Sequence, residues 1–133
     1  MGKLHEFSLK TEQTGVYNIT RSVIDTVRSS GIESGIAVIF CPHTTAAITL
    51  NENTDTNVGF DLLLGMERAF PDSEDYKHSE GNSYAHIRSS SLGCEITVII
   101  DEGWPLLGIW QNVYFVEFDG PRERKYYIKL VEC

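Results

Sequence analysis

Short strand patterns recur along the whole chain, and they constrain its fold more than any other feature. Residues 35–41, GIAVIFC, form a continuous apolar run rich in β-branched residues, which is typical of a buried strand. Residues 3–11 alternate between apolar and polar side chains, as expected of a half-buried strand. Further strand patterns occupy residues 94–101, 110–118 and 125–132. Such a chain is expected to form an extensive, mainly antiparallel sheet.

A first helix is expected after residue 20. Thr20 is a favourable N-cap, and Gly31 is placed to end the helix in the left-handed conformation. The residues between them put one apolar stripe on the helix, formed by Val23, Ile24 and Val27. This stripe predicts a helix that packs against the sheet.

Two further helices are expected in the middle of the chain. One begins at Thr54 or Asp55 and ends before Pro71, and its apolar residues recur at four-residue steps: Val58, Leu62, Met66 and Phe70. The other is short, begins at Asn82 or Ser83 and ends at Gly93. Together with the strands, these helical pieces predict an α+β domain of two layers, dominated by antiparallel sheet.

Length and composition favour one domain over residues 1–133, because no linker, repeat or shift in composition divides the chain. The formal charge of −8 argues against a nucleic-acid partner. No apolar run approaches the ~18 residues of a membrane span, and the first residues lack a signal peptide's apolar core. We therefore expect a cytoplasmic protein without a membrane partner. Cys41, Cys94 and Cys133 fit reduced thiols, and the first two are expected in the core.

The segment at residues 43–53 is predicted to be extended, and its two faces differ. One face carries Ala46, Ile48 and Leu50. The other is small and hydrogen-bonding, with His43, Thr45, Ala47, Thr49 and Asn51. A solvated strand face ordinarily carries lysine and glutamate, so the second face is expected to lie close to a ligand or another subunit.

The most informative polar side chains are three histidines: His43, on the small face, and His78 and His86, on a later loop and helix. Neutral imidazole is the commonest metal ligand, and a catalytic zinc ion typically has three protein ligands. The seven-residue spacing between the last two is not a tight metal-binding signature. The plain alternative is that each histidine is a partly exposed polar residue.

Two groups of residues suit an anionic ligand. Ser89 and Ser90 offer hydroxyl donors, and the N-terminus of a helix adds positive partial charge, although a run of serines is also simply a helix that cannot continue. Arg122 and Arg124 belong to the one basic segment, residues 119–125. That segment suits a small phosphate-bearing molecule, while the commoner meaning is a charged hairpin tip.

Glu117 is unexpected in a strand rich in aromatic and apolar side chains, because burying an unpaired charge is costly. Its expected partner is Arg122 or Arg124, across the following turn. Two interpretations stay open: a carboxylate that takes part in the chemistry of the site, or an ion pair that fixes a hairpin.

Three motifs in the same order resemble the YjbQ-like family, also called the secondary thiamine-phosphate synthase family. They are residues 43–55, HTTAAITLNENTD; residues 78–93, HSEGNSYAHIRSSSLG; and residues 108–124, GIWQNVYFVEFDGPRER. The resemblance implies a small α+β domain with a β-sandwich core that assembles as a homotrimer, with sites near the subunit boundaries.

The same resemblance implies a metal cluster of His43, His78 and His86, most plausibly with Zn²⁺, while Mg²⁺ is a second option. It also implies that Asn82 and Glu117 are catalytic or pocket residues. The activity attached to the family is a weak thiamine-phosphate synthase reaction, which couples a hydroxymethylpyrimidine diphosphate to a thiazole phosphate.

Two hypotheses about function follow. In the first, the protein is a metal-dependent enzyme, a transferase or a hydrolase, that acts on a small phosphorylated metabolite bound by Ser89, Ser90, Arg122 and Arg124. In the second, the same pocket captures a phosphorylated ligand without turnover, and the protein is a binding or sensing module.

Overall fold

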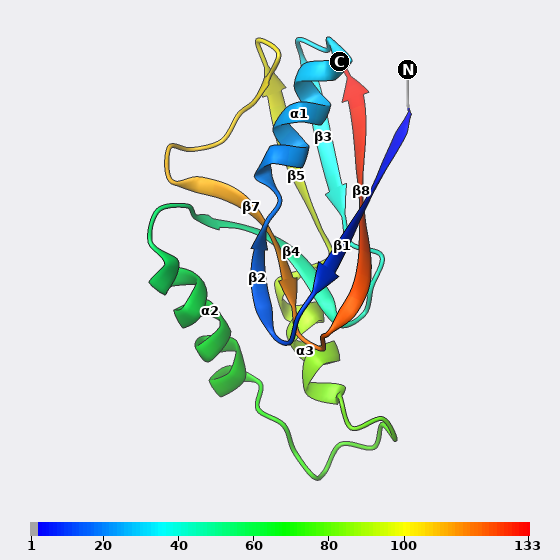
Figure 1. Ribbon diagram of the computed structural model, residues 1–133, viewed down its shortest axis with the longest axis vertical. Helices are drawn as coiled ribbons and strands as arrows, with labels where there is room; N and C mark the ends of the chain where they lie inside the picture. The colour runs from blue at the N-terminus through cyan, green and yellow to red at the C-terminus, as the bar shows by residue number, and fades with distance from the viewer. Residues whose placement is uncertain (1–2) are drawn as a thin grey trace.

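Two antiparallel sheets form the body of the protein in the computed structural model, which describes residues 3–133 (Figure 1). The larger sheet has the order β1 (Leu4–Thr11), β8 (Arg122–Glu132), β3 (Gly35–Phe40), β5 (Glu95–Asp101) and β6 (Trp104–Pro105). The smaller has the order β2 (Gly15–Asn18), β7 (Gln111–Glu117) and β4 (Ala46–Glu52). All of these pairings are antiparallel. The α+β class dominated by antiparallel sheet, predicted from the sequence, is confirmed.

One apolar core lies between the two sheets. The larger sheet contributes Ile39 of β3 and Ile128 of β8, and the smaller sheet contributes Ile48 of β4 and Phe115 of β7; all four are 1% exposed or less. The ring of Phe115 lies 6.2 Å from that of Tyr126, so side chains from the two sheets are in contact. Their alternation along each strand is what the period-two pattern of the sequence predicts.

Helix α1 (Thr20–Ser30) adds to this core, as its apolar stripe predicts. Val23 and Val27 are fully buried, and Gly31 ends the helix at a φ of 74°. The predicted cap differs, because Thr20 is already helical. Asn18 supplies the capping oxygen, which accepts from the Thr20 amide at 3.0 Å, while the Thr20 hydroxyl accepts a hydrogen bond from the Val113 amide at 2.8 Å.

The opposite face of the smaller sheet is covered by helices. Helix α3 (Ser83–Leu92) places Ala85 against Ala47 of β4, in a second cluster with Val116 and Phe118. The small residues predicted on this strand face therefore let a helix of the same chain approach closely. A strand face of alanine and threonine leaves room for a helix backbone, which the larger side chains of a solvated face do not.

Helix α2 (Thr56–Ala69) stands beside the smaller sheet and is packed less tightly (Figure 1). Asp55 caps it, as predicted, by accepting a hydrogen bond from the Asn57 amide at 2.9 Å. None of its residues is fully buried, although Leu63 and Met66 contact the second cluster. Within residues 3–133, no helix combines the length and apolarity needed to cross a membrane.

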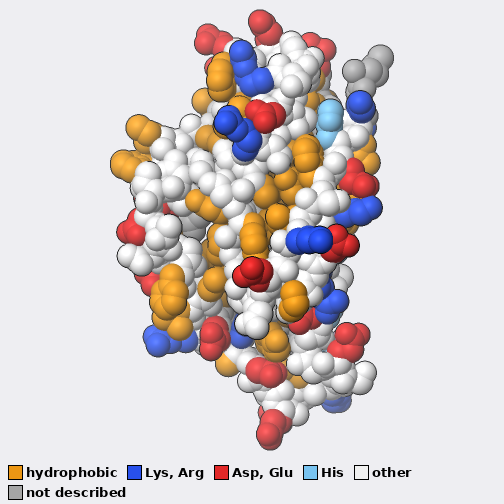
Figure 2. All heavy atoms as spheres, viewed as in Figure 1, with side chains coloured by type: hydrophobic (Ala, Val, Ile, Leu, Met, Phe, Trp, Pro, Cys, Tyr) orange, Lys and Arg blue, Asp and Glu red, His pale blue; other side chains and the backbone are white. Residues whose placement is uncertain are grey.

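The outer face of the larger sheet carries exposed apolar side chains. Ile36 of β3 lies between Ile99 of β5 and Val131 of β8, which are 55% and 44% exposed. The loop before β7 projects from the body of the molecule, and hydrophobic atoms are visible on it (Figures 1 and 2). Ile109 and Trp110 of this loop are 83% and 59% exposed. Exposed apolar side chains therefore lie on this face of the larger sheet and on the loop before β7.

All three cysteines are free thiols. Cys41 is buried in the core, as expected, and burial raises the pKa of its thiol to about 11. The prediction that Cys94 belongs to the core is wrong, because this residue is exposed. It precedes β5, which begins at Glu95.

Candidate functional site

A buried ion pair lies at the turn between β7 and β8. Arg124 donates from Nε to Oε1 of Glu117 at 2.7 Å, and from Nη2 to Oε2. The Glu117 and Arg124 side chains are 0% and 5% exposed. The sequence suggests Arg122 or Arg124 as the partner of Glu117, and the structure shows that the partner is Arg124. The ion pair joins β7 to β8 across their hairpin.

Residues from β1, from the turn and from the segment before β4 hydrogen-bond to this ion pair. Thr11, at the end of β1, donates to Oε1 of Glu117 at 2.5 Å, and the Asp119 amide donates to Oε2 at 2.9 Å. Thr45, just before β4, accepts from Nη2 of Arg124 at 2.8 Å. The sequence does not reveal Thr11 as a partner, because it lies more than a hundred positions from Glu117 and leaves no spacing signal. Asp119 is only two positions away, but its contact is made by its backbone amide, which any residue at that position carries.

These contacts set the protonation of Glu117. Burial alone raises the pKa of a carboxyl group, but the hydrogen bonds from Arg124 and Thr11 outweigh burial and hold the pKa of Glu117 below its ordinary value. A folded-state pKa below the unfolded one means that the ionised group stabilises the fold above the unfolded pKa. This stabilisation is lost as the pH falls through the folded-state pKa.

A second hydrogen-bonded layer joins the turn to the start of α3, which lies close to it in Figure 1. Oδ2 of Asp119 accepts from Nδ2 of Asn82 at 2.7 Å and from Nη2 of Arg122 at 3.0 Å. These two donors keep the pKa of Asp119 low, against the opposing effect of burial. Oδ1 of Asn82 is buried and has no hydrogen-bond partner.

His78 and His86 lie together at the same end of the protein. Their ring centres are 5.3 Å apart and the rings are nearly perpendicular, at 89°. Nε2 of His78 is 3.7 Å from Oε1 of Glu80. The seven residues between them comprise a turn and the first turn of α3, so the chain reverses and brings the two imidazoles side by side.

His43 is held differently. Its Nε2 accepts a hydrogen bond from the Lys125 amide at 2.9 Å. Burial, and next the charge of Arg124, lower the pKa of His43, so the imidazole is neutral near pH 7 and carries its proton on Nδ1. Within residues 3–133, no group of three or more histidine, cysteine, aspartate or glutamate side chains is arranged to hold a metal ion. The three-histidine cluster stays a prediction.

The predicted anion-binding residues are divided between interior and surface. Ser89 is buried, with an unpartnered hydroxyl, while the neighbouring Ser90 is exposed. Successive residues of a helix point about 100° apart, so the two hydroxyls face different surroundings. Arg124 is engaged by Glu117, whereas the Arg122 side chain is 47% exposed. Arg122 and Ser90 are thus the members of this set that solvent reaches.

Comparison with known proteins shows the family. A family model described as "UPF0047 protein YjbQ-like" matches residues 5–133. The chain belongs to the YjbQ-like UPF0047 family. It is 45% identical over 129 residues to a UPF0047 protein of Methanocaldococcus jannaschii, covering 96% of this chain and 94% of that one. It is 46% identical over 122 residues to YugU of Bacillus subtilis, covering 91% and 92% of the two chains.

Solved structures of YjbQ-like proteins share this fold. An uncharacterised member from Clostridium acetobutylicum superimposes with a TM-score of 0.93 at 49% identity, over 96% of this chain and 99% of that one. A YbjQ-like protein of unknown function from Sulfolobus solfataricus gives 0.90 at 32% identity over the whole of both chains. Membership of the YjbQ-like family, which the sequence motifs predict, is therefore confirmed. The names of these relatives assign no activity and do not mention thiamine-phosphate synthesis, so that part stays a prediction.

The buried ion pair generates a prediction about stability. Arg124→Met leaves the Glu117 carboxylate buried without its partner, and we expect it to lower the free energy of unfolding by about 3–5 kcal/mol. The control is Arg122→Met, which removes an exposed arginine and is expected to cost less than about 1 kcal/mol. Urea unfolding measures both, and equal losses in the two variants contradict the assignment.

Proposed function

We propose that this YjbQ-like protein is a metal-dependent enzyme that acts on a small phosphorylated metabolite. The observation that carries the proposal is the spacing of His78 and His86. With Zn–N bonds of ~2.1 Å and a tetrahedral angle, two imidazole rings on one zinc ion have centres about 5 Å apart. The 5.3 Å between these ring centres fits that requirement.

His78 and His86 are the residues that hold the metal in this proposal. Two imidazoles favour Zn²⁺, because Mg²⁺ prefers oxygen ligands. A catalytic zinc ion uses further ligands from the protein or from water. The family resemblance suggests His43 as the third protein ligand. Its Nε2 accepts a hydrogen bond from the Lys125 amide, and this bond has to break before Nε2 binds a metal ion. When bound, the ion polarises a phosphoryl or carbonyl oxygen or activates water.

The surrounding side chains bind and orient the metabolite. Arg122 offers an exposed guanidinium to a phosphate group, and Asp119 fixes both Arg122 and the amide of Asn82. Asn82 is held on Asp119 through its Nδ2, and its buried Oδ1 meets a donor of the metabolite only when the surrounding side chains move apart. Glu117 acts by holding the hairpin through Arg124, and Ser90 supplies a surface hydroxyl. Ser89 has its hydroxyl inside, without a hydrogen-bond partner, so it is left out of the binding set.

A prediction about zinc tests the metal site. Zinc is expected to stabilise the wild-type protein by about 2.7 kcal/mol at a free concentration one hundred times its dissociation constant. His78→Ala and His86→Ala each remove a ligand and are expected to abolish this effect. His5→Ala, which removes an imidazole from β1, is the matched control and keeps it. Thermal unfolding with and without zinc measures the shift, and a full shift in His86→Ala contradicts the proposal.

The specific reaction that we propose to test is thiamine-phosphate synthesis. The thiazole nitrogen attacks the methylene carbon of the pyrimidine diphosphate, the carbon–oxygen bond breaks, and pyrophosphate leaves. We expect slow pyrophosphate release that requires both substrates and is lost in His86→Ala. Measurable release from the diphosphate alone, also lost in His86→Ala, assigns a hydrolase instead.

A binding or sensing role is the second candidate, and the open position of the site favours it. His78 and Arg122 have side chains 42% and 47% exposed, and an enzyme usually excludes water around its reacting groups. Binding of the diphosphate substrate without any release of phosphate or pyrophosphate supports this role and contradicts the enzyme.

For assembly, we propose a homotrimer built through the exposed apolar surface. The outer face of the larger sheet and the loop before β7 supply it, with Ile99 and Ile109 as its most exposed isoleucines. Covering such surface with a second copy removes apolar area from water at about 25 cal/mol per Å². A trimer boundary near the histidines is a further source of metal ligands.

The mass of the native protein tests this assembly. Light scattering is expected to give three times the 15.0 kDa chain mass, and Ile99→Lys is expected to lower it. Phe60→Lys is the control, because Phe60 is 65% exposed on α2, away from the larger sheet. A wild-type monomer, or equal effects of the two variants, contradicts the proposal.

A further inference from the structure

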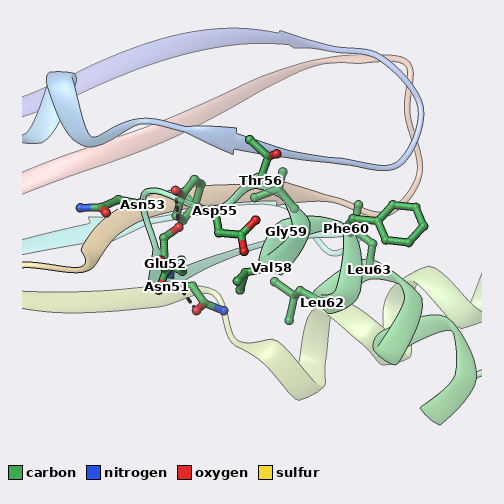
Figure 3. A pocket seen from close by; sticks show the side chains of 12 residues that line it. Asn51, Glu52, Asn53, Asp55, Thr56, Val58, Gly59, Phe60, Leu62 and Leu63 are labelled. Carbon is green, nitrogen blue, oxygen red and sulfur yellow. Dashed lines mark hydrogen bonds between the residues drawn. The ribbon is translucent and has the colours of Figure 1, made fainter.

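A cavity of about 270 Å³ lies between α2 and the smaller sheet, and none of the predicted site residues lines it (Figure 3). Its apolar wall includes Val58, Leu62 and Leu63 of α2, facing Val16 of β2 and Tyr114 of β7. Its polar rim runs from the end of β4 to the first residue of α2 and consists of Asn51, Glu52, Asn53, Asp55 and Thr56. An apolar hollow with a few polar groups at one end is the usual form of a small-molecule site.

The cavity is kept open by features of α2 itself. This helix has no fully buried residue, so its inner apolar face is not completed by the body of the protein. Gly59 lines the cavity, and a Cβ on it meets only Val16, at 3.9 Å. Glycine weakens a helix relative to alanine. A larger residue would strengthen the helix at position 59 and would fit the available space. Glycine at this position leaves the cavity open.

The charged groups around the cavity are all acidic. Glu52 and Asp55 line it, and none of the twelve lining residues is lysine, arginine or histidine. Figure 3 shows the Asp55 carboxylate directed over the first turn of α2, while the Phe60 ring points away from this carboxylate. Asn53 also lines the cavity, but Figure 3 shows its amide group directed away from α2, and its Nδ2 donates to the Ile109 carbonyl at 3.1 Å. The rim therefore offers acceptors and negative charge.

We propose that this cavity binds a small organic amine, with an apolar body and a protonated amino group. The apolar body lies against Val58, Leu62 and Leu63, and the ammonium group meets the carboxylates of Glu52 and Asp55. A protonated amine supplies the positive charge that this lining lacks, and N–H donors for its two carboxylates. The site is separate from the histidines, so it stands or falls independently of the proposed reaction.

The test uses 2-phenylethylamine as the probe, with calorimetry and NMR titration of the full chain. Its neutral and anionic counterparts are 2-phenylethanol and 3-phenylpropanoate, which keep the ring and change the charge. We expect the amine to bind at least about fivefold more tightly than the alcohol, and the carboxylate to bind least well. The reason is that the charged residues of the cavity lining, Glu52 and Asp55, are both acidic and partly exposed. Equal binding of amine and alcohol, or no binding of the amine at ~10 mM, overturns the proposal.

A pair of glycine variants locates the binding. Gly59→Leu fills the cavity and is expected to abolish amine binding. Gly65→Leu makes the same change on the same helix, at a position that does not line the cavity. No atom lies within 4 Å of the new Cβ, so this variant is expected to leave amine binding unchanged. Both replace glycine inside a helix, so neither is expected to unfold the protein. Unchanged binding in Gly59→Leu places the amine elsewhere and overturns the assignment.

Charge-removing variants test the role of the rim. Asp55→Asn removes the negative charge and keeps a residue that caps the helix well. Glu52→Gln removes the negative charge at the end of β4 and keeps the size of the side chain. Each is expected to weaken amine binding roughly twofold to fivefold, which is the strength of a partly exposed ion pair. Full affinity in both variants shows that the charges do not select the ligand and contradicts the proposal.

Discussion

The buried ion pair between Glu117 and Arg124 is the interaction on which the rest of the structure depends. Glu117 belongs to the smaller sheet and Arg124 to the larger one, so the pair ties the two sheets together at their shared hairpin. Thr11 and Thr45 bring β1 and the start of β4 to the same point. Two buried charges are tolerated only when each finds its partner, so other registers of this hairpin leave a charge unpaired.

The same hairpin positions the candidate site. The turn after Glu117 carries Asp119, which fixes Arg122 on one side and Asn82 at the start of α3 on the other. Helix α3 in turn sets His86 beside His78. The interior ion pair is thus connected to the surface histidines through one hydrogen-bonded series. A change at Arg124 is therefore expected to disturb the site as well as the fold.

Much of the fold follows from the sequence, because side-chain period and capping residues act locally. The alternation at β4, the stripe on α1 and the Asp55 cap are of this kind. The cost of a buried charge predicts a partner for Glu117, and the turn that follows it narrows that partner to Arg122 or Arg124. What the sequence does not reveal depends on distant contacts. The capping oxygen of α1 comes from Asn18, and the short strand β2 is formed only by pairing with β7.

The site residues divide along the same line. The sequence places Ser89 and Ser90 together, yet the helix sends one hydroxyl inside and the other to solvent. The close approach of His78 and His86 needs a chain reversal that their spacing alone does not specify. The cavity beside α2 left no motif at all, because it arises from a helix that packs incompletely. Its acidic rim and the basic Arg122 lie on different parts of the protein and suit ligands of opposite charge.

The most direct measurement is a crystal structure of the protein grown with zinc, with anomalous diffraction recorded on both sides of the zinc absorption edge. The account predicts a zinc peak between His78 and His86, about 2.1 Å from one nitrogen of each ring. A map without a peak there, in crystals where both imidazoles are ordered and accessible to zinc, contradicts it.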